Sequence, residues 1–146
     1  MITYYTDGSA SPNPGPGGFA VIKNGQPWLI GGEDNPTETT NIRMEGMALL
    51  AALKDAAGES CQIYSDSEFW INVLTKWAPN WKANSWTKKG GIKNLDIVQP
   101  LFGEYERSKA TLIWTRGHAG TELNELADEW ANRAREQKVR GISRCE

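Results

Sequence analysis

The sequence Ile2-Thr3-Tyr4-Tyr5-Thr6-Asp7-Gly8-Ser9 sets the architecture that we expect for the whole chain. Its first five residues are apolar or β-prone and predict a strand, and Asp7 and Gly8 follow at the carboxyl end of that strand. Ligands of α/β proteins collect at the carboxyl ends of strands, so Asp7 is a candidate for a functional site. The alternative is that Asp7 only begins a turn, which Gly8 makes easier.

The alternation of strand and helix patterns after Ser9 predicts an α/β fold. Residues 11–18 are rich in Pro and Gly and predict a chain reversal, and two antiparallel strands follow at 19–22 and 27–30. Pro79 is expected to end a helix and to begin an irregular excursion. These elements predict a five-stranded mixed sheet, with three antiparallel strands followed by parallel ones and helices on its faces. The further expected elements are helices at about 42–54, 68–75, 94–108 and 123–137 and strands at 62–65 and 111–115.

Length and composition favour one ordinary globular domain. The chain has 146 residues, of which 39% are hydrophobic and 23% are charged. No apolar run approaches the roughly 20 residues of a membrane-spanning helix, and the chain begins directly as a strand, without the pattern of a secretory signal. We therefore expect a cytoplasmic monomer that does not interact with membranes, with one domain over residues 1–138 and a flexible tail over 139–146.

Glu45 is the most informative acidic residue. On the predicted helix it shares a face with Ala48, Leu49 and Ala52, which together form a row that is typical of a buried surface. A carboxylate on such a row is unfavourable unless it is paired or binds a metal ion. The alternative is that Glu45 lies at the solvent edge of the first helical turn, where the helix dipole favours it.

Two further carboxylates occur where they could reach the same edge of the sheet. Asp66 follows the predicted strand at 62–65, although Asp66 with Ser67 could also serve only as a helix cap. Asp128 lies one helical step from the apolar stripe of the last helix, and the alternative there is a solvated side chain. Four carboxylates without a cluster of Cys or His favour hard, oxygen-liganded ions such as Mg²⁺ or Mn²⁺ over zinc.

A window of tryptophans and lysines is the strongest indication of a nucleic-acid partner. The net charge of the chain is only −2, but no acidic residue occurs between Trp70 and Leu95. Trp70 has apolar neighbours and is expected in the core, whereas the other tryptophans alternate with polar residues, which suits base and phosphate contacts. The alternative is a core cluster with a solvated face of lysines. The window contains Trp70, Trp77, Trp81 and Trp86 together with Lys76, Lys82, Lys88, Lys89 and Lys93.

Histidine and cysteine are rare in this chain. His118 is the only histidine and lies between Gly117 and Gly120 in a predicted loop, which favours a mobile, titratable group over a packed core residue. An ordinary loop histidine is the alternative. Cys61 and Cys145 are expected to be reduced thiols rather than a disulfide bridge, because the chain has no secretory signal.

Taken together, these motifs resemble the type 1 ribonuclease H family from one end of the chain to the other. Each block alone is a weak signal, but their order and spacing within one small domain are specific. The matching blocks are Thr6-Asp7-Gly8-Ser9, Asn13-Pro14-Gly15-Pro16-Gly17-Gly18, Thr40-Asn41 with Arg43-Met44-Glu45, Ser65-Asp66-Ser67, Asn80-Trp81-Lys82 with Trp86, and Gly117-His118-Ala119-Gly120 with Asn124 and Asp128.

The resemblance implies a ribonuclease H-like fold and hydrolysis of the RNA strand of RNA/DNA hybrids, leaving 5′-phosphate and 3′-hydroxyl ends. It implies that Asp7, Glu45, Asp66 and Asp128 bind two Mg²⁺ ions, with Mn²⁺ as a possible substitute, and that His118 assists proton movement or product release. The alternatives are a non-catalytic hybrid-binding module and a related metal-dependent DNA nuclease. The substrate contacts expected from the resemblance and from the tryptophan–lysine window are Asn13, Thr40, Asn41, Trp77, Trp81, Lys82, Trp86, Lys88 and Lys89.

Three positions depart from the pattern of the family. Glu38 is acidic where members often carry a basic residue, Ile42 is apolar where a polar residue usually contacts RNA, and Glu68 is charged where a neutral residue is usual. All three lie beside expected substrate contacts rather than among the four carboxylates. We therefore expect them to change hybrid affinity more than catalysis.

Overall fold

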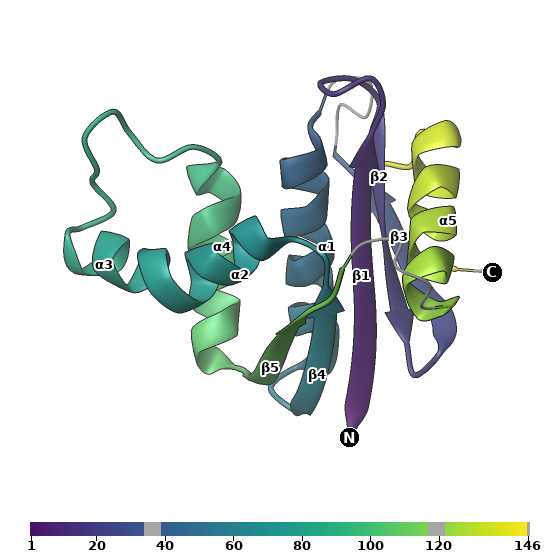
Figure 1. Ribbon diagram of the computed structural model, residues 1–146, viewed down its shortest axis with the longest axis horizontal. Coiled ribbons are helices and arrows are strands. Elements are labelled where there is room, and N and C mark those ends of the chain that lie inside the picture. Colours follow the sequence, from purple (N-terminus) through teal and green to yellow (C-terminus); the bar gives the residue numbers. More distant parts are fainter. Residues whose placement is uncertain (34–38, 117–121, 146) are drawn as a thin grey trace.

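A mixed β-sheet runs through the centre of the molecule (Figure 1). The computed structural model describes residues 1–33, 39–116 and 122–145. Within these residues the sheet has six strands in the order β5-β4-β1-β2-β3-β6, which confirms the predicted α/β fold and adds one strand to it. The strands are β1 (Ile2–Ala10), β2 (Gly17–Lys23), β3 (Gln26–Gly32), β4 (Ser60–Ser65), β5 (Lys109–Trp114) and β6 (Gly141–Arg144).

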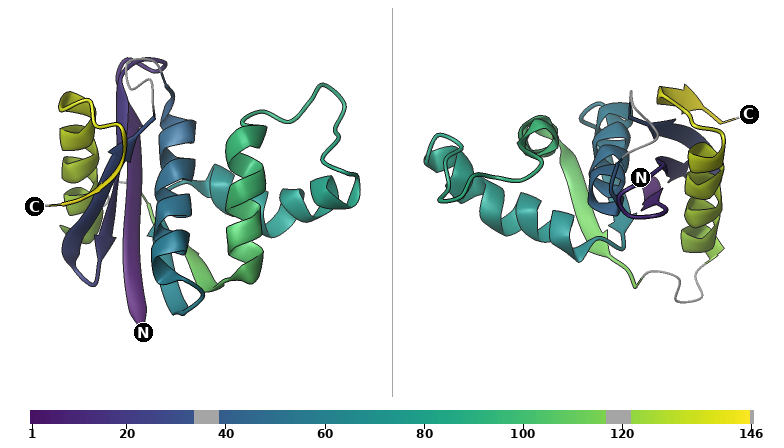
Figure 2. Two further views of the ribbon diagram at one scale, coloured as in Figure 1. Left: turned by 180° about the vertical axis from the view of Figure 1, so that it is seen from behind. Right: turned by 90° about the horizontal axis from the view of Figure 1, so that it is seen from above.

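Helices cover both faces of this sheet. Helix α1 packs on one face and α5 packs on the other, while α4 lies beside α1, away from the sheet (Figures 1 and 2). No helix in the described part of the chain has the length and apolar character that crossing a bilayer requires. The helices are α1 (Asn41–Ala56), α2 (Glu68–Asn72), the π-helical segment η1 (Val73–Trp77), α3 (Ala78–Ala83), α4 (Leu95–Arg107) and α5 (Glu122–Glu136).

β1 joins the parallel part of the sheet to the antiparallel part. It runs parallel to β4, with Tyr5 opposite Tyr64, and antiparallel to β2, with Asp7 opposite Ala20. Tyr4 is fully buried on the α1 side, and its hydroxyl donates a 2.6 Å hydrogen bond to Asp55. The strand that carries Asp7 is thus hydrogen-bonded to a neighbouring strand on each side and packs against α1 on one face.

Trp70 belongs to the core, as its sequence context predicts. It is fully buried, and its Nε1 donates a 2.6 Å hydrogen bond to the carbonyl of Ile42 in the first turn of α1. Gly46 allows this approach, because a Cβ added there would lie only 2.6 Å from the indole. The contact joins α2 to the helix that carries Glu45.

The prediction that Pro79 ends the second helix is wrong. The chain continues from α2 through η1 into α3, and the three segments follow one another along the molecule (Figure 1). The N–H of Ala78 bonds to the carbonyl of Val73, five residues back, so the helix widens before the proline. Pro79 then occupies the first turn of α3, where no N–H is needed.

The expectation of a loose tail after residue 138 is also wrong. β6 pairs antiparallel with β3, with Arg144 opposite Leu29 and Gly141 opposite Gly32. The guanidinium of Arg144 lies 3.3 Å from the centroid of the Trp28 ring, a cation–π contact that anchors the strand. All four of its residues are exposed, and Ile142 is the one large apolar residue among them, so the sequence shows no alternation that would indicate a strand.

Both cysteines are free, in agreement with the expectation of reduced thiols. Cys61 is buried on β4, and Cys145 follows β6 and donates its backbone N–H to the carbonyl of Trp28 at 2.9 Å. β4 and β6 are four steps apart in the strand order, which is roughly 19 Å at the usual strand spacing. A bridge within one folded chain is therefore excluded, since the two Cα atoms of a disulfide lie within about 7 Å of each other.

Candidate active site

Asp7 and Asp66 come from neighbouring parallel strands. The register that pairs Tyr5 with Tyr64 places Asp7 opposite Asp66 when it is carried two residues forward, just past the end of β4. Asp7 is only 8% exposed, and its Oδ1 accepts a 3.0 Å hydrogen bond from the N–H of Gly8. The two carboxylates therefore meet at one edge of the sheet, as their positions in the sequence predict.

Glu45 reaches the same place from α1. A Cβ added to Gly8 would lie 2.3 Å from the backbone nitrogen of Glu45, so only glycine lets the helix approach β1 so closely. The start of the helix is fixed by Thr40, whose hydroxyl accepts a 3.1 Å hydrogen bond from the N–H of Arg43. Burial raises the pKa of Glu45 to about 7; a hydrogen bond with Ser67 lowers it, and the charge of Asp66 raises it further.

Asp128 joins the cluster from α5, on the opposite face of the sheet. Burial is the largest cause that raises the pKa of Asp7, to about 9, and the charges of Asp66 and Asp128 and a hydrogen bond with Asp128 add to it. Asn132, one turn after Asp128, donates a long 3.5 Å hydrogen bond to Asp128 Oδ2 and accepts one from Ser9 at 3.3 Å. Asp128 is thus turned toward β1 rather than toward water alone.

The alternative role of Asp66 as a helix cap is not needed. Ser67 is the N-cap of α2, and its hydroxyl accepts a 3.2 Å hydrogen bond from the N–H of Trp70. The backbone N–H of Ser67 in turn donates to Ser65 Oγ at 3.1 Å. The turn after β4 is therefore organised by two serines, which hold Asp66 beside Asp7.

The chemistry of the carboxylates suits a divalent cation. Asp7 and Glu45 have raised pKa values because burial and like charges disfavour their ionised forms, and a cation between them would offset both effects. All four candidate ligands offer oxygen, which Mg²⁺ and Mn²⁺ prefer. Across residues 1–33, 39–116 and 122–145, no group of three or more His, Cys, Asp or Glu side chains is already arranged to hold an ion. The four carboxylates therefore suit a metal ion by the chemistry of their oxygen atoms, and not because they already form a coordination site.

Two residues singled out from the sequence lie outside the described residues. These are His118, the expected proton carrier, and Glu38, the acidic departure from the family pattern.

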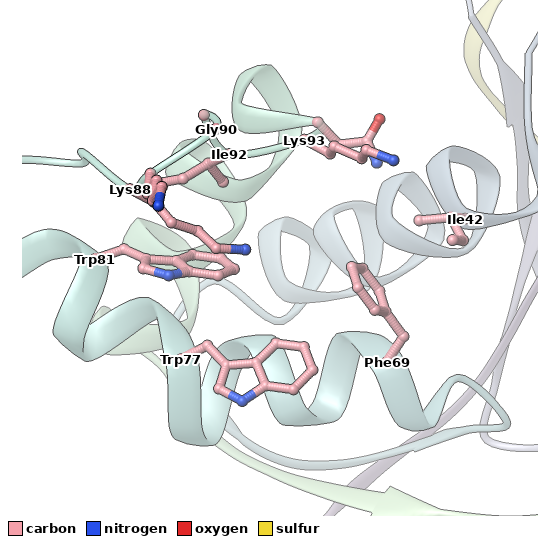
Figure 3. Close-up of a pocket in the computed structure, with 11 residues that line it drawn as sticks. Ile42, Phe69, Trp77, Trp81, Lys88, Gly90, Ile92 and Lys93 are labelled. Atoms are coloured by element: carbon pink, nitrogen blue, oxygen red, sulfur yellow. The ribbon is translucent and has the colours of Figure 1, made fainter.

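A groove of about 680 Å³ lies between α2, α3 and the loop that precedes α4 (Figure 3). Trp77, 40% exposed, stands with its ring centroid 6.3 Å from that of Trp81 and 5.9 Å from that of Phe69. The ammonium of Lys88 lies 5.6 Å from the Trp81 ring, and Lys89 lines the same groove. The structure therefore brings together aromatic and basic side chains that the sequence analysis assigned to substrate binding.

Two members of the expected set do not line this groove. Lys82 points to α4, where its ammonium pairs with Glu106 at 2.7 Å. Trp86 is half-buried and packs edge-on against Phe102, with ring centroids 6.0 Å apart. Trp86 therefore packs partly against α4 instead of lining the groove, because the left-handed turn at Ser85 and Trp86 folds its ring back onto that helix.

A second, shallower depression of about 480 Å³ continues this surface toward α1. It shares Ile42, Lys93 and Asn94 with the groove and adds Asn13 and Thr40, as the sequence analysis expected of substrate contacts. Lys93 belongs to the tryptophan–lysine window but not to the expected substrate contacts. Asn94 carries no sequence signal of a substrate contact, and its position before a helix indicates only a possible cap.

Asn41 has an internal role in this region. Its Oδ1 accepts a 2.6 Å hydrogen bond from the N–H of Ala10, and its own N–H donates to Asn13 Oδ1 at 3.1 Å. Asn41 therefore links the end of β1 to the turn that carries Asn13, and the sequence pattern alone gave no sign of this bond.

Comparison with known proteins assigns the family. The sequence model of the family described as RNase H matches residues 1–136. The chain belongs to the ribonuclease H family. It is 42% identical to the ribonuclease H of Rhizobium etli over 96% of this chain and 95% of that protein, and 40% identical to that of Hahella chejuensis over 90% of each.

Solved structures show the same fold at low sequence identity. The crystal structure of LC9-RNase H1, described as a type 1 RNase H with the type 2 active-site motif, matches with a TM-score of 0.82 at 24% identity over 99% of this chain and 77% of that one. A foamy viral protease-reverse transcriptase in complex with RNA/DNA hybrid matches with a TM-score of 0.77 at 18% identity, over 93% of this chain and 20% of that one. The expected ribonuclease H-like fold is confirmed.

Proposed function

We propose that this chain is an endonuclease that hydrolyses the RNA strand of RNA/DNA hybrids and leaves 5′-phosphate and 3′-hydroxyl ends. One observation supports the proposal: in a chain of the ribonuclease H family, Asp7 interacts electrostatically with Asp66 and Asp128, and Glu45 interacts with Asp66, so that each of the four carboxylates interacts with at least one of the others. These four carboxylates come from two strand ends and two helices on opposite faces of the sheet. Such convergence from distant segments is typical of an active site.

We further propose that the four carboxylates hold two Mg²⁺ ions, for which Mn²⁺ can substitute. When bound, such a pair of ions activates a water molecule and stabilises the leaving 3′ oxygen during in-line attack on the RNA phosphate. The raised pKa values of Asp7 and Glu45 support this role, since no cationic side chain in the described part of the chain offsets their charges. His118 is proposed to assist proton movement or product release.

Substrate binding is proposed along the continuous surface formed by the groove and the shallow depression. Trp77 and Trp81 offer faces for sugar and base contacts, and Lys88, Lys89 and Lys93 offer charges for phosphates. The preference for a hybrid would follow from the shape of the duplex and the 2′-hydroxyl groups of its RNA strand. We propose that the protein acts as a monomer, because one chain supplies both the carboxylates and this surface.

The test is cleavage of matched duplexes. The purified protein is incubated with Mg²⁺ and an RNA/DNA hybrid labelled on its RNA, the same hybrid labelled on its DNA, duplex RNA, and duplex DNA. Asp7→Asn, purified identically, controls for contaminating nuclease. We expect cutting of the RNA strand of the hybrid alone, and none by the variant. Cutting of duplex DNA would instead indicate a DNA nuclease, and tight binding of the hybrid without cutting would indicate a binding module.

A further inference from the structure

Arg43 uses all of its hydrogen-bond donors inside the protein. Its Nε donates to both carboxylate oxygens of Glu33, at 3.0 and 3.1 Å. One terminal nitrogen bridges Glu33 at 2.8 Å and Asp96 at 2.7 Å, and the other bridges Asp96 at 3.0 Å and Asn94 at 3.2 Å. A guanidinium has five N–H donors, and these contacts occupy them. Arg43 therefore has no donor left for a phosphate, although it lies two residues from Glu45.

The partners of Arg43 come from separate segments of the chain. Glu33 follows β3, whereas Asn94 and Asp96 lie at the start of α4. Glu33 also accepts a hydrogen bond from the hydroxyl of Thr39, and Thr39 exchanges two backbone hydrogen bonds with Gly15, at 2.9 and 2.6 Å. The network thus extends from α4, through the first turn of α1, to the turn that contains Gly15.

These segments are the ones that frame the shallow depression. Asn13 belongs to the turn, Thr40 caps α1 and Asn94 directly precedes α4, and all three line the depression while Arg43 does not. Asn94 has a left-handed backbone conformation, with φ of 58°, and therefore lies outside the regular helix α4. Its position relative to α1 depends on its contacts with other segments. Its bond to Arg43 is such a contact. Arg43 and Glu33 therefore connect the walls of the depression without forming its surface.

The charges of this network do not themselves favour a nucleic acid. Hydrogen bonds from Arg43 hold the pKa of Asp96 below its usual value, and bonds from Arg43 and Thr39 outweigh the burial that would raise the pKa of Glu33. Both carboxylates are ionised at neutral pH, so two negative charges surround one positive charge. With a net negative charge, this network would repel a polyanion slightly. Any favourable contribution of the network to binding must therefore come from the positions it gives to the surrounding segments.

We propose that Arg43 is a positioning residue that, through Glu33 and Asp96, sets the spacing of the segments around the shallow depression and thereby determines how tightly the hybrid is held. The inference rests on the proposed function, because it concerns the affinity for the same substrate. Lysine cannot replace arginine here, since a single ammonium group cannot bridge two carboxylates and an amide in one plane.

The test compares Arg43→Lys, Asp96→Asn and the double variant with the wild-type chain, using Kd for an RNA/DNA hybrid without divalent ions and kcat and KM with Mg²⁺. Simple electrostatics predicts that removing the negative charge of Asp96 strengthens the binding of a polyanion. If Arg43 acts by positioning, the opposite is expected. Each single variant should raise Kd and KM by about fivefold, with kcat within about twofold of the wild-type value. The double variant should bind the hybrid no more weakly than Arg43→Lys does.

The control is Glu104→Gln, which removes a half-buried acidic group whose partner, Arg107, is on the same helix. We expect it to leave Kd unchanged or slightly lower. Amide exchange of Thr39 and Gly15 without substrate gives a second readout, and we expect faster exchange in Arg43→Lys. Should Arg43→Lys fail to fold, Asp96→Asn alone carries the test, because the Asp96 side chain is 65% exposed.

Three outcomes would overturn the inference. Tighter binding by Asp96→Asn would mean that charge, not spacing, governs the depression. A salt dependence that becomes shallower by about one phosphate contact in Arg43→Gln, which removes the charge that Arg43→Lys keeps, would mean that Arg43 contacts the substrate directly. A lower melting temperature with unchanged Kd and KM would mean a purely structural role. Failure of the wild-type chain to bind hybrid would reject the proposed function and this inference with it, and the wild-type measurement distinguishes that case from the others.

Discussion

At the scale of single residues, Asp7 is in an environment that opposes its own ionisation. It is 8% exposed, and the only hydrogen bond from the described backbone to its carboxylate is that of Gly8. Burial, followed by the charges of Asp66 and Asp128, raises its pKa to about 9. At neutral pH the folded protein therefore either keeps a proton at this site or bears repulsion that a divalent cation can relieve.

This environment predicts that Asp7→Asn stabilises the metal-free protein while it removes activity. A carboxyl group with a raised folded-state pKa favours folding below its unfolded-state pKa, near 4, and this contribution is lost as the pH rises toward about 9. At pH 8 the variant should therefore be more stable by up to about 5 kcal/mol, and near pH 4 the difference should vanish. Urea unfolding at both pH values measures it. Mg²⁺ should stabilise the wild-type chain more than the variant; equal stability of the two metal-free proteins at pH 8 would contradict the prediction.

At the scale of elements, patterns that repeat along the sequence were predictable and contacts between distant segments were not. The β-prone run before Asp7 predicts the strand that positions it. The apolar row shared by Glu45 and Ala48 predicts the helix that carries Glu45. β6 carries no such pattern, and only pairing with β3 reveals it. The sequence predicts a helix end near Pro79 because sequence rules describe α-helical bonding, whereas the preceding π-helical segment has a different spacing.

The anchoring of β6 predicts a measurable stability difference. Arg144 lies over Trp28, and the ammonium of Lys23 lies 4.7 Å from the centroid of the same ring. Arg144→Ala should lower the free energy of unfolding by about 1 kcal/mol and increase amide exchange in β6, since β6 has only β3 as a neighbour. Arg140→Ala, an exposed arginine outside the strand, is the matched control. Equal stability of the two variants would show that backbone pairing alone holds β6.

At the scale of the whole molecule, binding of a polyanion has to be local. The net charge is −2, so the protein as a whole does not attract nucleic acid. Lys88, Lys89 and Lys93 all line the groove beside Trp77 and Trp81, at the end of the molecule that projects away from the sheet (Figures 1 and 3). This arrangement separates the surface that is proposed to hold the duplex from the carboxylates that are proposed to cut it.

The salt dependence of hybrid binding should therefore depend on particular lysines. Replacing Lys88 and Lys89 by alanine should weaken binding and reduce the slope of log K against log salt by about one to two, because each phosphate contact releases about one counterion. The matched control is the double variant Lys54→Ala and Lys109→Ala, which removes the same charge from exposed positions at the far ends of α1 and β5. Filter binding at several salt concentrations measures both slopes. If the two double variants change the slope equally, the effect is one of net charge, and the groove is not where the phosphates bind.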